Sequence, residues 1–239
     1  MTIDAGNLHF RTLNQRIRDA GGTARVENCL GQRYIGSGMQ GMRITIHGTP
    51  GNALGAYFDG ERIEVFGNAQ DAAGDTMNDG RIIIHGSSGD ATGYAMRGGK
   101  IFIRGSAGYR AGIHMKAYQN KIPTLIVGER TGSFLGEYQA GGHIVVLGIG
   151  LDGAVPVGDF CGTGMHGGAI YLRCSELPAD LPSQVCSGRA TAEDLAEIEP
   201  DLREYCGLFG FDAGEILGSN FYVLRPNLQS PYRQLYTHN

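Results

Sequence analysis

Four consecutive blocks decide the fold of this chain: YIGSGMQGMRITIHGTPGN (34–52), ALGAYFDGERIEVFGNAQD (53–71), AAGDTMNDGRIIIHGSSGD (72–90) and ATGYAMRGGKIFIRGSAGY (91–109). They align without a gap, and a period of 19 residues runs through all four. The key glycines of the repeat are Gly36, Gly55, Gly74, Gly93 and Gly112, followed after 24 and 26 residues by Gly136 and Gly162. A fixed period of this kind is typical of stacked units, none of which buries its apolar face alone.

Each block holds one segment that alternates apolar and other residues with a period of two, as a β-strand does. The two aliphatic columns are expected to point inward: Ile44, Ile63, Ile82 and Ile101, and Ile46, Val65, Ile84 and Ile103. Nineteen residues are too few for a strand-helix-strand crossover, and the blocks lack a helical apolar stripe. The sequence therefore predicts an all-β fold, a right-handed parallel β-helix of about seven coils with one main strand per coil, stacked about 4.8 Å apart.

Both ends are predicted to carry short helical caps, because the open sheet edges of a solenoid need covering. LNQRIRDAGG, which starts at Leu13, indicates an amphipathic helix stopped by two glycines. Near the other end, Thr191 and Asp194 are spaced as a capping box, and further helices are expected over Asp201–Phe209 and Ala213–Leu217. The expected units are an N-terminal cap segment (1–33), the β-helix (34–175) and a helical and extended tail (176–239), with loops projecting near Tyr118–Thr124 and Gly150–Val157.

Composition limits the classes of function. Five cysteines, an odd number without a CxxC pair, argue for a reducing compartment and against a disulfide frame or a metal cluster. No apolar stretch reaches the roughly 20 residues that a membrane span needs. A net charge of −4 with scattered cations gives no reason to expect nucleic acid. We expect a soluble, cytoplasmic protein that binds neither membrane nor nucleic acid.

Three motifs suggest chemistry, and each has a simpler interpretation. Gly36–Gly41 and Gly162–Gly167 match the GxGxxG dinucleotide pattern, but strands rather than helices are predicted after them, so we interpret the glycines as corners. His47 and His85 share a column two coils apart, too far for one metal ion. Cys161 and His166 lack a third group to orient them as nucleophile and base, and an inward cysteine is usually an inert small hydrophobe. We therefore predict no catalytic, cofactor or metal residues in this chain.

One apolar stripe is predicted on the outer face of the sheet. Phe66, Ile83 and Phe102 fall on consecutive coils at positions that should point outward. Apolar patches of this kind are covered in the native protein, either by the tail of the same chain or by another subunit. We take these three residues as the candidate docking face and leave both alternatives open.

The blocks GTPGNALGAYFDG, GNAQDAAGDTMNDG, GSAGYRAGIHMK, GEYQAGGHIVVLG and GDFCGTGMHGGAIYL, in this order, resemble the GXGXG domain, the β-helical C-terminal domain of the large subunit of glutamate synthase. The resemblance extends through DAGNLHFRTLNQRIRDAG and the closing SPYRQLYTHN to forms of the domain encoded as a separate protein. The glutaminase nucleophile, flavin site and cluster cysteines of that family lie in other domains, and no position here matches them.

The resemblance implies a non-catalytic structural subunit of a glutamate-synthase-type complex in glutamate biosynthesis. Its partners would be a glutamine amidotransferase subunit and a synthase subunit that holds FMN and iron–sulfur clusters, fixed so that ammonia passes between them. The alternatives are a scaffold subunit of a formylmethanofuran dehydrogenase-type complex or of a related N-methylglutamate synthase. A free-standing enzyme or ligand-binding β-helix is a further alternative.

Overall fold

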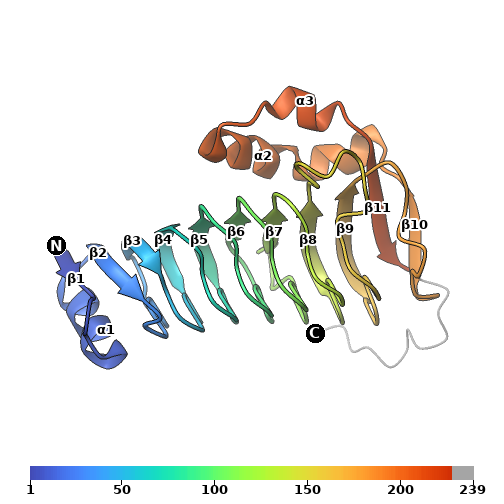
Figure 1. The fold of residues 1–239 in the computed structure, drawn as a ribbon. Helices are drawn as coiled ribbons and strands as arrows, with labels where there is room; N and C mark the ends of the chain where they lie inside the picture. The colour runs from blue at the N-terminus through green and yellow to red at the C-terminus, as the bar shows by residue number, and fades with distance from the viewer. Residues whose placement is uncertain (228–239) are drawn as a thin grey trace.

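The computed structural model describes residues 1–227, which form a solenoid around a single 11-stranded sheet (Figure 1). The closing segment SPYRQLYTHN lies outside the described residues. Strands β1 to β9 pair in parallel in chain order, and the sheet ends in the order β9-β11-β10 with antiparallel pairs. The strands are β1 (Thr2–Asp4), β2 (Thr23–Leu30), β3 (Arg43–Thr49), β4 (Asp59–Phe66), β5 (Asp79–Ile84), β6 (Lys100–Ile103), β7 (Thr124–Val127), β8 (Ala140–Val146), β9 (Gly167–Arg173), β10 (Val185–Arg189) and β11 (Phe221–Pro226). The predicted parallel β-helix is confirmed.

The register places like side chains on top of one another. Ile44 pairs with Ile63, Ile63 with Ile82 and Ile82 with Ile101, as the period of 19 residues requires. All four side chains are fully buried inside the solenoid, together with the second aliphatic column. The assignment of inward and outward columns from the sequence is therefore confirmed for these strands.

The key glycines are required by backbone conformation and by space together. Gly55 has a φ of +63°, and a Cβ atom there would lie 2.6 Å from Cδ1 of Ile82 on the next coil. Gly36 has a φ of +76°, and its Cβ would lie 2.7 Å from Cδ1 of Ile63. These two corners thus face the aliphatic ladder across a narrow interior, which leaves no room for a side chain.

The corners are also joined by backbone hydrogen bonds to the coils on either side. Ala53 N–H donates to Asp71 O on the following coil, and Gly55 N–H donates to Ile35 O on the preceding coil. The residues two positions before and two positions after each key glycine also adopt positive φ, although most of them are not glycine; Ala53 and Tyr57 are examples. Because of this repeated positive φ, the backbone N–H groups of a corner point in turn to the following and the preceding coil. The corners of neighbouring coils are therefore hydrogen-bonded almost as regularly as the strands.

The insertion that follows Gly112 forms a tight hairpin. Tyr118 and Lys121 pair as an antiparallel bridge at its tip. Lys121 Nζ lies 2.9 Å from Asp79 Oδ2 and donates to Asn78 O at 3.2 Å, which ties the hairpin to an earlier coil. A Cβ at Gly98 would lie 3.0 Å from the Lys121 side chain, so the glycine there lets the hairpin lie flat.

At the N-terminal end, helix α1 (Phe10–Asp19) packs Leu13 and Ile17 into the solenoid interior. The amphipathic helix predicted here is confirmed. Strand β1 pairs in parallel with β2, and β2 pairs in parallel with β3. The sheet therefore begins within residues 1–33.

At the C-terminal end, helix α2 (Ala192–Phe209) begins with the predicted capping box of Thr191 and Asp194. The helix runs through Pro200, where the sequence predicted a separate helix from residue 201 onward. It stays continuous because residues on both sides of the proline, Ile198 and Leu202, are buried against the same sheet face. Helix α3 (Ala213–Leu217) forms as predicted. No helix within residues 1–227 is long and apolar enough to cross a membrane.

Candidate interaction surfaces

Helix α2 buries most of the predicted docking face. Ile83 and Phe102 belong to a second core, outside the solenoid interior, that also contains Ile198, Leu202 and Tyr205 of α2. The Phe102 ring meets the Tyr205 ring edge-on, with centroids 6.0 Å apart. The docking face proposed from the sequence is therefore wrong for Ile83 and Phe102, which the chain's own C-terminal segment covers (Figure 1).

A column of polar residues at the start of successive strands holds α2 in place. Lys100 Nζ lies 2.6 Å from Asp201 Oδ1 and 3.0 Å from Glu204 Oε2, and Arg81 forms an ion pair with Glu204. Thr124, next in the column, donates from its hydroxyl to Asp201 Oδ2 at 2.7 Å. The acidic edge of the helix thus follows the basic edge of the sheet from coil to coil.

The charge pairing lowers the pKa of Glu204 below its usual range. Partial burial alone would raise the pKa of this carboxyl, but hydrogen bonds from Arg81 and Lys100 outweigh that effect. The pKa of Lys100 is raised although burial opposes its charge, because Asp201 and Glu204 both accept hydrogen bonds from it. These groups therefore stabilise the docked helix only while the carboxylates are ionised.

Phe66, the third residue of the predicted docking face, remains 43% exposed. Its ring stacks between His47, at a centroid distance of 4.8 Å, and His85, at 4.4 Å. His85 Nε2 lies 2.9 Å from Glu64 Oε1. The two histidines and Phe66 thus form an aromatic ladder. No group of three or more potential metal ligands occurs among the described residues.

The other two motifs are the pair Cys161 and His166 and the two GxGxxG matches. Cys161 is fully buried, and burial raises the pKa of its thiol to about 12, which keeps it protonated near neutral pH. His166 Nδ1 lies 3.2 Å from Gly164 O, a backbone contact within its own corner. The two GxGxxG matches lead into strands β3 and β9, as predicted, and not into helices.

An aromatic surface on the glycine corners was not predicted from the sequence. Tyr109, Phe134 and Phe160 form a row with ring centroids 5.4 and 5.0 Å apart, and the guanidinium of Arg110 lies over the first two rings. The column of Phe134 and Phe160 holds alanines in three of the earlier coils, at Ala53, Ala72 and Ala91, and the insertions hide the continuation of the period. Aligning the key glycines across the insertions would have revealed the row.

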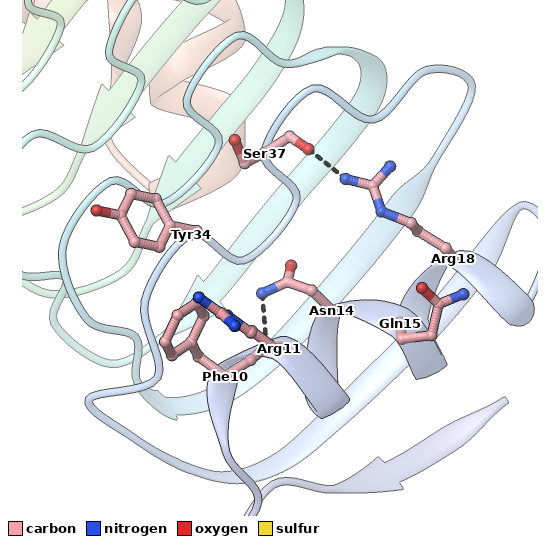
Figure 2. Close-up of a pocket in the computed structure, with 7 residues that line it drawn as sticks. All are labelled: Phe10, Arg11, Asn14, Gln15, Arg18, Tyr34 and Ser37. Carbon is pink, nitrogen blue, oxygen red and sulfur yellow. Dashed lines mark hydrogen bonds between the residues drawn. The ribbon is translucent and has the colours of Figure 1, made fainter.

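A pocket of about 260 Å³ lies between α1 and the first glycine corner (Figure 2). It is open to solvent and is lined by Phe10, Arg11, Asn14, Gln15, Arg18, Tyr34 and Ser37. Asn14 fixes its floor, since its amide donates to Phe10 O at 2.9 Å and to Arg33 O at 3.2 Å. Arg18 Nη2 donates to Ser37 O at 2.8 Å and closes one side.

Comparison with known proteins agrees with this architecture. A model of the GXGXG motif family matches residues 10–227. The chain is 44% identical over 252 aligned positions to an uncharacterized protein of Methanocaldococcus jannaschii, covering 99% of this chain and 96% of that protein. Its fold is similar to a chain in the crystal structure of the formyltransferase/hydrolase complex (FhcABCD) from Methylorubrum extorquens with methylofuran. The TM-score is 0.65 at 19% identity, with 92% of this chain and 88% of that chain covered.

The ladders, the glycine corners and the helix-covered face define a parallel β-helix protein with capped ends. The match over residues 10–227 places it more closely: the chain belongs to the GXGXG motif family.

Proposed function

We propose that this chain is a non-catalytic structural subunit of a multi-subunit complex of the glutamate-synthase type. In this role it holds a glutamine amidotransferase subunit and an FMN- and iron–sulfur-containing synthase subunit in fixed positions for ammonia transfer. The chain itself would bind no cofactor. Membership of the GXGXG family supports the proposal, because the sequence resembles separately encoded forms of the glutamate synthase domain.

The observation that carries the proposal is a packed, rigid rod. Nine parallel strands about 4.8 Å apart give a body roughly 40 Å long. Its interior is filled by aliphatic ladders and a methionine column, and its corners are hydrogen-bonded from coil to coil. Such a body can hold two subunits apart at a fixed distance, since bending it would break whole ladders of contacts.

A second candidate is a structural subunit of a formyl-transferring complex. The similarity in fold to a chain of the Methylorubrum extorquens formyltransferase/hydrolase complex favours it, because that chain too is part of an assembly of several subunits. The same rigid rod would serve there, with different partners on its surfaces.

The test is purification of the tagged full-length chain from its native cells, followed by identification of stoichiometric partners. An amidotransferase and a flavin-containing subunit are expected under the first candidate, and formyl-transfer subunits under the second. The isolated chain should show no glutaminase activity and no bound flavin. A chain that stays monomeric without a stoichiometric partner, or that turns over glutamine alone, would overturn the structural role.

A further inference from the structure

The N-terminal end of the solenoid carries positive charge that the chain itself does not neutralise. Residues 1–42 contain five arginines and three acidic residues, whereas the whole chain has a net charge of −4. The three acidic side chains are already engaged: Asp4 accepts from Asn28, Asp19 accepts from Gln15, and Glu27 pairs with Arg25. Within residues 1–227, the other four arginines of this segment have no carboxylate partner: Arg11, Arg16, Arg18 and Arg33.

The basic residues farther along the sheet behave differently. Arg43, Arg62, Arg81 and Lys100, which occupy one column of four successive strands, each have an acidic partner on the same strand, a neighbouring strand or helix α2. Neutralisation by the chain is therefore the rule in this column, and the N-terminal cap departs from it. Two of the four unpaired arginines, Arg11 and Arg18, line one pocket, and guanidinium groups in such a place indicate a surface complementary to carboxylates.

The pocket between α1 and the first corner combines charge with exposed aromatic surface. The rings of Phe10 and Tyr34 lie 5.7 Å apart at 54°, and Tyr34 is about half exposed. The Arg11 guanidinium lies 5.8 Å from the centre of the Phe10 ring, and Arg18 lines the opposite side (Figure 2). Aromatic and arginine side chains around a small depression are the composition of protein-binding hot spots.

The size of the pocket favours a protein segment over a small molecule. Its volume of about 260 Å³ is below the range of about 300–1,000 Å³ that is usual for ligand pockets, and it is open to solvent. A small ligand would stay largely hydrated there. An extended segment can instead place one side chain in the depression while its neighbours lie along the rim.

We propose that this pocket docks an acidic segment of a partner protein, with carboxylates on Arg11 and Arg18 and an apolar or aromatic side chain against Phe10 and Tyr34. The inference rests on the proposed structural role, since it assigns one of the surfaces that hold a partner. Asn14 acts as a positioning residue, because its side chain joins α1 to the first corner: its amide donates to Arg33 O and its carbonyl accepts from Gly36 N–H.

The experiment measures binding of a synthetic peptide, acetyl-Glu-Glu-Tyr-Glu-Glu-amide, to the full-length chain at low salt. The pocket variant is Arg11→Gln with Arg18→Gln. The matched control is Arg97→Gln with Arg130→Gln, two exposed arginines without an ion pair on other coils. We expect the pocket variant to weaken binding at least tenfold and the control to change it less than twofold. Because Arg18 also holds Ser37, Arg11→Gln alone is included and should weaken binding about threefold.

Three results would overturn the inference. The control variant could weaken binding as much as the pocket variant, the peptide with Gln in place of Glu could bind equally well, or the small dicarboxylate glutarate could bind as tightly as the peptide. The first two would indicate diffuse or uncharged attraction, and the third a small-molecule site. None of them depends on isolating a complex, so this inference and the structural role can fail separately.

Discussion

Truncating Phe102 should test directly whether α2 lies on the sheet in solution. Phe102 is 0% exposed, enclosed by Ile83 and Ile126 of the neighbouring strands and by Tyr205 of α2. We expect Phe102→Ala to lower the free energy of unfolding by about 3–5 kcal/mol, the usual cost of removing an enclosed aromatic ring. Phe66→Ala, on β4 two strands away, is the matched control, and its half-exposed ring should cost about 1 kcal/mol.

The measurement is urea unfolding followed by tyrosine fluorescence, since the chain has no tryptophan. With a slope of about 3 kcal/mol per molar urea, a loss of about 4 kcal/mol moves the midpoint by roughly 1.3 M. The control should move it by about 0.3 M. Equal shifts for the two variants, or a Phe102→Ala midpoint within about 0.3 M of wild type, would contradict burial beneath α2.

The remaining predictions concern the repeat, its corners and the ion pairs that hold α2 on the sheet. Deleting residues 72–90, one full period, should keep every ladder in register and leave a soluble chain that melts cooperatively, whereas deleting 72–81 should not; equal failure of both would refute the modular coil. Gly55→Ala should cost at least about 3 kcal/mol in chemical denaturation because its Cβ meets Ile82, whereas Gly21→Ala, at positive φ with nothing within 4 Å, should cost about 1–2 kcal/mol. The pKa of Glu204 is lower in the folded protein than in the unfolded chain, where it is about 4.3. The ionised carboxylate therefore contributes fully to the free energy of unfolding above about pH 4.3, and this contribution is lost as the pH falls through the pKa of the folded state. Thermal melts should therefore show that stability falls less steeply between about pH 5 and 3 in Glu204→Gln than in wild type. The same dependence of stability on pH in both proteins would show that the ion pairs of Glu204 with Arg81 and Lys100 contribute little.

The solenoid could be predicted because its information is local and repeated. Each strand carries the same two aliphatic columns, and the period of 19 residues fixes both the register and the inward face. One key glycine per block locates each corner. The sequence could show that a glycine is needed at a corner, but it could not show the clash between an added Cβ and an isoleucine of the next coil. That clash depends on the width of the solenoid interior, which only the structure gives.

The cover over Ile83 and Phe102 could not be assigned in the same way. It depends on contacts between residues far apart in the chain, such as the hydrogen bond of Arg81 to Glu204 across 123 positions. The sequence showed an apolar stripe on the outer face and a helix with a capping box near the C-terminus. Nothing periodic linked the two, so a partner subunit and the chain's own tail explained the stripe equally well.

The point where α2 ends decides which part of the outer face is left for other molecules. The second core spans β5 to β9, and α2 lies over this part of the sheet (Figure 1). The helix stops at Phe209, whose ring meets His85 edge-on. Toward the N-terminus, the outward column changes from apolar residues to Glu64 and Thr45, and the basic column pairs with nearby glutamates instead of a helix. The chain thus completes its own packing at the C-terminal half and leaves Phe66 and the arginines of α1 exposed. A partner that needs charge and aromatic contact finds both at the N-terminal half, where the Arg11 and Arg18 variants test for it.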